Sequence, residues 1–304
     1  MASKQNASKR HAHRIVFVTG KGGVGKSAVA AATALQFARA GQSVLLAELG
    51  SHSFYGPLLG LPVDYEPVQW QPRIGVVRWD VQSALREYIA HLLVFKAAAD
   101  KVLNNTVMKA LVTSAPSLSE LAILGKLTAP MRHRWYKRDV DVVVVDAYAT
   151  GQFMALLRAP RGLSETAASG SMRTQTEAIT ELLSDPAICE YRLVTLAEEM
   201  PVSEACEMAV DIRAETGIAP RIYCNRLLTL RDNIPRRPAA DLCAPFLAHM
   251  GQIAQRQTRS MAELEALGAD RDGPVRQLPL ILSNDAKTLL EQLADALEES
   301  DRAA

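Results

Sequence analysis

The stretch Gly20-Lys-Gly-Gly-Val-Gly-Lys-Ser27 decides the fold of this chain, because it matches the phosphate-loop pattern G-x-x-x-x-G-K-[ST]. An apolar, β-rich run over residues 15–19 leads into it, and an Ala-rich helical run over 28–40 leads out of it. The order strand, loop, helix is the context that this pattern requires. Glycines let successive backbone N–H groups turn toward phosphate oxygens, where a side chain would block the approach.

The loop therefore predicts a nucleoside triphosphate site that also holds Mg²⁺. The start of the following helix adds partial positive charge where the phosphates would lie. We expect Lys26 to reach the β- and γ-phosphates and the hydroxyl of Ser27 to hold Mg²⁺. The other loop positions expected to contact the nucleotide are Gly22, Gly23, Val24 and Gly25.

Composition places the chain among ordinary globular proteins. It has 304 residues, of which 48% are hydrophobic and 22% are charged. A formal net charge of +1 gives no support for binding nucleic acid or membranes through bulk charge. The four cysteines lie far apart without a C-x-x-C pair, which predicts reduced thiols and a cytoplasmic protein.

Neither end of the chain carries a membrane signal. Residues 1–13 are polar and basic without an apolar core, so we expect a disordered tail rather than a secretory signal. No run approaches the roughly 20 apolar residues that a membrane span needs, so direct membrane insertion is not expected.

Strands alternate with helices along the chain, which predicts an α/β fold with a doubly wound, mostly parallel sheet. Two helical segments, about 81–135 and 161–185, interrupt this alternation and predict an inserted helical subdomain within a single domain over residues 14–300. The expected strands are 14–19, 43–48, 75–79, 142–146, 192–196, 221–224 and 276–281, and the expected helices outside the insertions are 27–40, 203–216 and 285–299. In such folds ligands bind outside the carboxyl ends of the strands.

Asp146 follows four consecutive valines, a run typical of a strand buried on both faces. A carboxylate that merely ends a strand is the plainer interpretation. With a phosphate loop in the same chain, a role in holding Mg²⁺ or its water is favoured. Shortly after it, Gly151 could donate its backbone N–H to the γ-phosphate and move when that phosphate leaves.

The segment Asp146-Ala-Tyr-Ala-Thr-Gly-Gln-Phe-Met-Ala-Leu-Leu-Arg-Ala-Pro160, together with residues 21–27, resembles the anion-transporting ATPase family. That family contains the arsenite pump ATPase and the ATPases that guide tail-anchored proteins to membranes. Its corresponding segment usually reads Asp-Thr-Ala-Pro-Thr-Gly-His, followed by a Leu-rich stretch and a Pro. Residues 194–205 and 278–280 resemble further family segments, so the likeness covers about 14–297.

The resemblance implies a MgATP-dependent enzyme that sandwiches nucleotide between two subunits, either as a homodimer or as a heterodimer with a paralogous ATPase. Lys21 would then reach across the interface to the partner's phosphates, as an arginine finger does. Asn225 lies where the family places an adenine-contacting Asn, and Pro279 lies in its nucleotide-side loop. A membrane-protein client is a further implication.

One departure from the family concerns the residue that positions the attacking water. Relatives carry an Asp shortly after the second strand, where this chain has Gly50. Glu48 or His52 could substitute, but two residues along a strand correspond to about 7 Å. We therefore expect either a catalytic role for Glu48 or weak hydrolysis.

Two observations bear on the client and on alternative functions. The helical segments contain few methionines, which weakens the case for a flexible groove that binds client helices, and no cysteine cluster there suggests an arsenite site. One alternative is a nucleotide-binding regulatory subunit paired with an active paralogue. Another is a ParA/MinD-like positioning ATPase, although the acidic sequence at 298–301 does not suit membrane binding and the net charge suggests no face for DNA.

Overall fold

The computed structural model describes residues 13–92, 116–132, 140–166, 171–228 and 244–304. They form an eight-stranded sheet of order β3-β4-β2-β5-β1-β6-β7-β8, in which only the pair β3–β4 is antiparallel. The strands are β1 (Arg14–Gly20), β2 (Val44–Leu49), β3 (Val68–Gln71), β4 (Ile74–Trp79), β5 (Val142–Ala149), β6 (Cys189–Leu196), β7 (Arg221–Leu227) and β8 (Arg276–Pro279). The predicted doubly wound α/β fold is confirmed.

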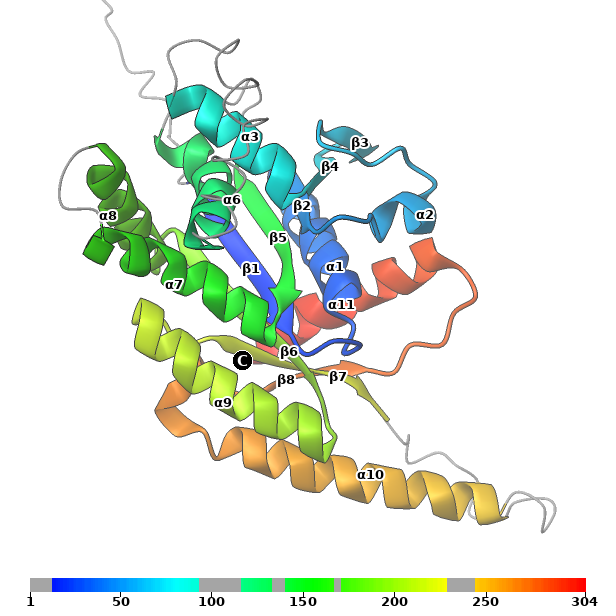
Figure 1. Ribbon diagram of the computed structural model, residues 1–304. Coiled ribbons are helices and arrows are strands. Elements are labelled where there is room, and N and C mark those ends of the chain that lie inside the picture. The colour runs from blue at the N-terminus through cyan, green and yellow to red at the C-terminus, as the bar shows by residue number, and fades with distance from the viewer. Residues whose placement is uncertain (1–12, 93–115, 133–139, 167–170, 229–243) are drawn as a thin grey trace, which may run out of the picture.

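Helices cover both faces of this sheet (Figure 1). α1 and α11 lie on one face, while α6, α7, α8 and α9 contribute to the core on the other. The helices are α1 (Lys26–Arg39), α2 (Tyr55–Leu59), α3 (Val81–Leu92), α6 (Pro116–Arg132), α7 (Thr150–Thr166), α8 (Ser171–Leu183), α9 (Glu199–Thr216), α10 (Ala244–Glu265) and α11 (Ala286–Ala303), with a short 3₁₀ turn at Gly268–Asp270.

β1 lies between β5 and β6 and is buried on both faces, as its continuous apolar sequence requires. Ile15 and Phe17 point into the core beneath α7 and α9, and Val16 and Val18 point into the core beneath α1 and α11. Four alanines of α1 are fully buried against the sheet, and their small side chains let this helix approach closely: Ala30, Ala31, Ala32 and Ala34. The strand that carries the phosphate loop is therefore held from every side.

Several boundaries differ from the sequence predictions. α7 begins at Thr150, directly after β5, so Gly151 belongs to the first turn of a helix, and α9 begins four residues earlier than expected. β8 ends at Pro279, two residues earlier than predicted. The edge strand β3 and the one-turn helix α2 were not predicted, because each is too short to show a periodic pattern.

The helical segment predicted at 81–135 contributes α3 and α6, which lie between β4 and β5 in the chain. α6 starts at Pro116, a residue whose missing N–H is tolerated in the first turn of a helix. Met108 and the rest of 93–115 lie outside the described residues, as does the tail over 1–12. Within the described part of the chain, no helix combines the length and apolar character that crossing a membrane requires.

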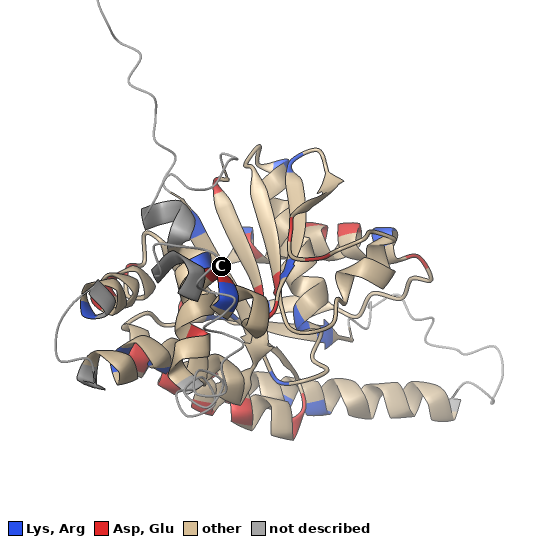
Figure 2. Ribbon diagram, turned by 45° about the horizontal axis from the view of Figure 1, so that its top comes forward, with Lys and Arg blue, Asp and Glu red and all other residues tan. Residues whose placement is uncertain are grey.

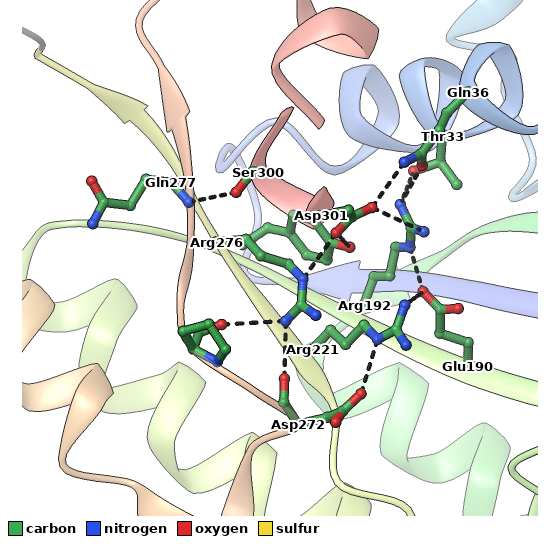
Figure 3. A network of polar contacts seen from close by, with 12 residues as sticks. Thr33, Gln36, Glu190, Arg192, Arg221, Asp272, Arg276, Gln277, Ser300 and Asp301 are labelled. Carbon is green, nitrogen blue, oxygen red and sulfur yellow. Dashed lines mark hydrogen bonds and ion pairs between the residues drawn. The ribbon is translucent and has the colours of Figure 1, made fainter. Parts of the chain in front are cut away.

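Charged residues of both signs are interspersed over the elements drawn in Figure 2. A buried set of them joins α11 to the sheet (Figure 3). Asp301 of α11 accepts hydrogen bonds from Tyr223 (2.8 Å) and from Arg276 (2.9 Å). Gln36 of α1 also donates to Asp301, at 2.8 Å. Arg192 of β6 is 2% exposed and lies 3.7 Å from the same carboxylate, so one side chain ties α11 to α1 and three strands.

The charges of this network shift the pKa of Asp301. Burial by itself raises that pKa, but Arg192 and the hydrogen bonds from neighbouring side chains outweigh burial and hold it below its ordinary value. An Asp whose pKa is lower in the folded than in the unfolded protein stabilises the fold above its unfolded pKa of about 4. That stabilisation is lost as the pH falls through the folded pKa.

We expect Asp301→Asn to lower the free energy of unfolding at pH 7 by about 3 kcal/mol, because it leaves buried Arg192 without a charged partner at that position. The loss should shrink as the pH falls below about 4. Urea unfolding across this pH range measures both effects. Asp295→Asn is the control, since that carboxylate makes an exposed ion pair with Arg39. Equal losses for the two variants would contradict the role given to the network.

Candidate nucleotide-binding site

The phosphate loop leaves the carboxyl end of β1 through two glycines that no other residue could replace easily. At Gly20 (φ +146°) an added Cβ atom would lie 2.1 Å from the carbonyl oxygen of Val194. At Gly25 (φ +94°) it would lie 2.5 Å from Nδ2 of Asn225. Both backbone conformations disfavour other residues, so the pattern of glycines is needed for the loop itself as well as for a ligand.

Two helix N-termini meet at this loop. Gly25 is the N-cap of α1, and Gly20 pairs with Ala149, after which α7 begins. N–H groups in the first turn of a helix have no partner within that helix, and the helix dipole makes this end positive. Gly22 and Gly23 of the loop and Gly151 of α7 are exposed. These three glycines are therefore accessible to an anion, whereas Val24 of the loop is buried.

The two lysines of the loop have different partners. Lys26 donates from Nζ to the carbonyl oxygen of Lys21, at 3.0 Å. Burial lowers the pKa of Lys26, while the nearby charge of Asp146 raises it. Lys21 itself forms an ion pair with Glu204 of α9 (2.5 Å), and both side chains are about one third exposed. Lys26 thus lies over the loop, and Lys21 is held within its own chain.

Asp146 lies on β5 beside the phosphate loop. It is in register with Val18 of β1 on one side and with Glu48 of β2 on the other. Burial raises its pKa to about 6, against the lowering effects of the hydroxyls of Ser27 and Tyr55. A buried carboxylate beside a serine hydroxyl offers the oxygen ligands that Mg²⁺ prefers, so this pair fits the metal role predicted for it.

Glu48 is buried close to Asp146, but the following loop occupies both of its oxygens. One accepts a hydrogen bond from Ser53 Oγ (2.7 Å), and the other accepts one from the backbone N–H of Phe54. His52 is exposed and contacts Ser51. Gly50 has φ +155°, and its N–H donates to Trp79 O at 3.2 Å. Glu48 therefore holds the turn that follows β2, and its catalytic role stays a prediction.

Asn225 contacts the phosphate loop directly, and its predicted contact with adenine stays a prediction. Its Nδ2 donates to the carbonyl oxygen of Val24 at 2.9 Å, and its Oδ1 accepts from the N–H of Arg226. Arg226 has φ +58° and places its guanidinium near Gly25. Pro279 ends β8, two strands beyond β6 in the sheet. Its contact with nucleotide stays a prediction.

Sequence reasoning missed two residues that lie at the site. Tyr55 is fully buried, and its hydroxyl contacts Asp146, while Glu204 pairs with Lys21. Neither belongs to a motif with fixed spacing, and both reach the loop from segments distant in the chain. An aromatic residue shortly after Gly50 was the only available signal for Tyr55.

A mostly parallel sheet with a phosphate loop after its central strand β1, and a carboxylate on the neighbouring strand, defines a P-loop nucleotide-binding protein. The model of one family within this class, described as Anion-transporting ATPase, matches residues 13–170. The chain belongs to this family, so the resemblance seen in the sequence is confirmed.

Individual relatives agree with this assignment. ATPase BagA of Mycobacterium tuberculosis is 31% identical over 202 residues, which are 64% of this chain and 59% of the relative. Proteins named arsenical pump-driving ATPase from Acidiphilium multivorum and Escherichia coli are 26% and 24% identical over 268 and 269 residues. These matches cover 83% of this chain and 44% of each relative, so the chain spans only part of the length of the proteins it matches.

We expect Asp146→Asn to stabilise the nucleotide-free protein at pH 7 by about 3 kcal/mol, because a folded pKa of about 6 means that the buried charge destabilises the fold. In wild type this penalty grows as the pH rises from about 4 to 6 and is constant above. The difference between variant and wild type in urea unfolding should grow over the same interval. Asp295→Asn, an exposed substitution, should show no such growth. A destabilised Asp146→Asn protein at pH 7 would contradict the assignment.

Proposed function

We propose that this protein is a MgATP-binding switch ATPase of the anion-transporting ATPase family. The observation that carries the proposal is the convergence of Lys26, Ser27 and Asp146 on a glycine loop between the N-termini of α1 and α7. That arrangement supplies cationic, hydroxyl and carboxylate groups where a triphosphate and its metal require them. The interspersed charges of Figure 2 and the net charge of +1 support a protein partner rather than nucleic acid.

The chain's own residues would divide the work as follows. Backbone N–H groups of the loop and of Gly151 bind the phosphates, and Lys26 neutralises their charge. Ser27 and Asp146 hold Mg²⁺, which when bound neutralises charge that develops during phosphoryl transfer. Hydrolysis is slow in this proposal, because Gly50 offers no carboxylate and both oxygens of Glu48 already accept hydrogen bonds.

Dimerisation would use Lys21 as the link between subunits. Its ion pair with Glu204 is about one third exposed, and such pairs contribute little to stability, so a triphosphate bound to a second subunit could replace it. The protein would act in the cytoplasm, where the dimer would form only with bound nucleotide. Its nucleotide state would then be passed to a client, such as a membrane protein. Because both oxygens of Glu48 already accept hydrogen bonds, a second candidate is also favoured: a regulatory subunit that binds nucleotide and pairs with an active paralogue.

Lys26→Ala should weaken binding of a fluorescent ATP analogue in the presence of Mg²⁺ by at least about tenfold, because it removes a charge-assisted contact to the phosphates. Equilibrium fluorescence titration measures the dissociation constant. Lys287→Ala on the exposed surface of α11 is the matched control and should bind as wild type does. Unchanged binding by Lys26→Ala would refute the proposed phosphate site.

Dimer formation gives an independent test. Sedimentation velocity with Mg²⁺ and a non-hydrolysable ATP analogue should show wild-type dimers, whereas Lys21→Ala should remain monomeric while still binding nucleotide. Glu204→Gln frees Lys21 and should dimerise at lower protein concentration. Wild type that stays monomeric at saturating nucleotide would reject the homodimer. Hydrolysis by wild type alone at the rate of active relatives would reject both slow turnover and the regulatory subunit.

A further inference from the structure

Tyr55 buries a phenolic hydroxyl at the candidate metal site. It is the first residue of α2, in the segment that follows β2, and its side chain is 0% exposed. The hydroxyl has two acceptors for its single proton, the carbonyl oxygen of Ser27 at 2.8 Å and Oδ2 of Asp146 at 3.1 Å. A buried tyrosine hydroxyl needs polar partners, and here both partners belong to the two residues expected to hold Mg²⁺.

The segment around Tyr55 is fixed in the position that presents this hydroxyl. Glu48 accepts hydrogen bonds from Ser53 Oγ and from the N–H of Phe54, and Ser53 Oγ in turn accepts from the N–H of Gly56, at 2.9 Å. The Tyr55 ring belongs to the apolar core beneath α1. The turn before α2 and the core thus hold the ring from both sides.

We propose that Tyr55 is a positioning residue for the metal site, which orients the carboxylate of Asp146 against the first turn of α1. This inference rests on the proposed MgATP-binding function and deepens it. A hydrogen bond to one carboxylate oxygen fixes the direction of the other, and such outer partners tune metal affinity. Tyr55 does not itself touch nucleotide or metal in this role.

The same contact connects the loop after β2 to the metal. Phe54, the residue before Tyr55, is 46% exposed. Its ring packs edge-on against the Tyr55 ring, with 5.4 Å between the ring centroids. Any movement of this loop that withdraws the hydroxyl would loosen Asp146, and Mg²⁺ held by Asp146 would in turn favour the packed loop. Contacts from Asp146 through Tyr55 to Phe54 therefore couple the metal site to an exposed aromatic side chain.

Tyr55→Phe removes only the hydroxyl and keeps the ring in the core. We expect the Mg²⁺ concentration needed for half-maximal tight binding of a fluorescent ATP analogue to rise about tenfold. Affinity for the analogue in excess chelator should stay as in wild type, since the phosphate loop is untouched. Tyr191→Phe is the matched control, because its buried hydroxyl donates to Leu183 O away from the site. That variant should titrate with Mg²⁺ as wild type does.

Ser53→Ala is a second variant, which loosens the turn that holds Tyr55 without touching Asp146. It should shift the Mg²⁺ titration in the same direction as Tyr55→Phe and by less. A Tyr55→Phe protein that titrates like wild type overturns the proposal, as does one whose affinity falls equally with and without Mg²⁺. Wild type that binds no analogue at all would instead refute the underlying MgATP-binding function.

Discussion

The close approach of Gly20 to the carbonyl of Val194 is the constraint on which the rest of the site depends. It lets β1 pair with β6 up to the point where the phosphate loop begins, while β5 pairs with its other edge. The loop therefore opens at the centre of the sheet, with Asp146 one strand away. Because β1 is buried on both faces, the loop is held by a strand that is packed from both sides.

Burying the charge of Asp146 is unfavourable, whereas the buried charges around Arg192 are paired with opposite charges. Asp146 is buried with Glu48 beside it, and its raised pKa reflects the cost of burying its charge. In the network around Asp301, by contrast, buried charges are paired. The guanidinium of Arg192 lies 2.7 Å from the carboxylate of Glu190 and 3.7 Å from that of Asp301. An electrostatic imbalance at the ligand site, beside a network in which Arg192 is paired with Glu190 and Asp301, is what a binding protein requires.

The parts predicted from sequence were those with strong local signals. Buried strands appear as apolar runs, as in residues 142–145, and the phosphate loop has fixed spacing. Prediction failed where tertiary contacts decide the secondary structure. The elements α2 and β3 are too short to show a pattern. Helix α7 begins at Thr150 because the chain must turn back over the sheet after β5. Lys21 pairs with Glu204, and Asp146 contacts Tyr55. Both partners come from distant segments, so no spacing within the sequence could reveal them.

The packing of α11 against α1 has a consequence for how the protein is made. Leu290, Leu293 and Leu297 complete the core beneath helix α1, which was synthesised some 250 residues earlier. The central strand likewise waits for β5 and β6 before either of its edges is paired. During translation the phosphate loop therefore emerges long before the sheet that shapes it. The apolar first strand therefore stays unpaired in the nascent chain until those later strands have been made.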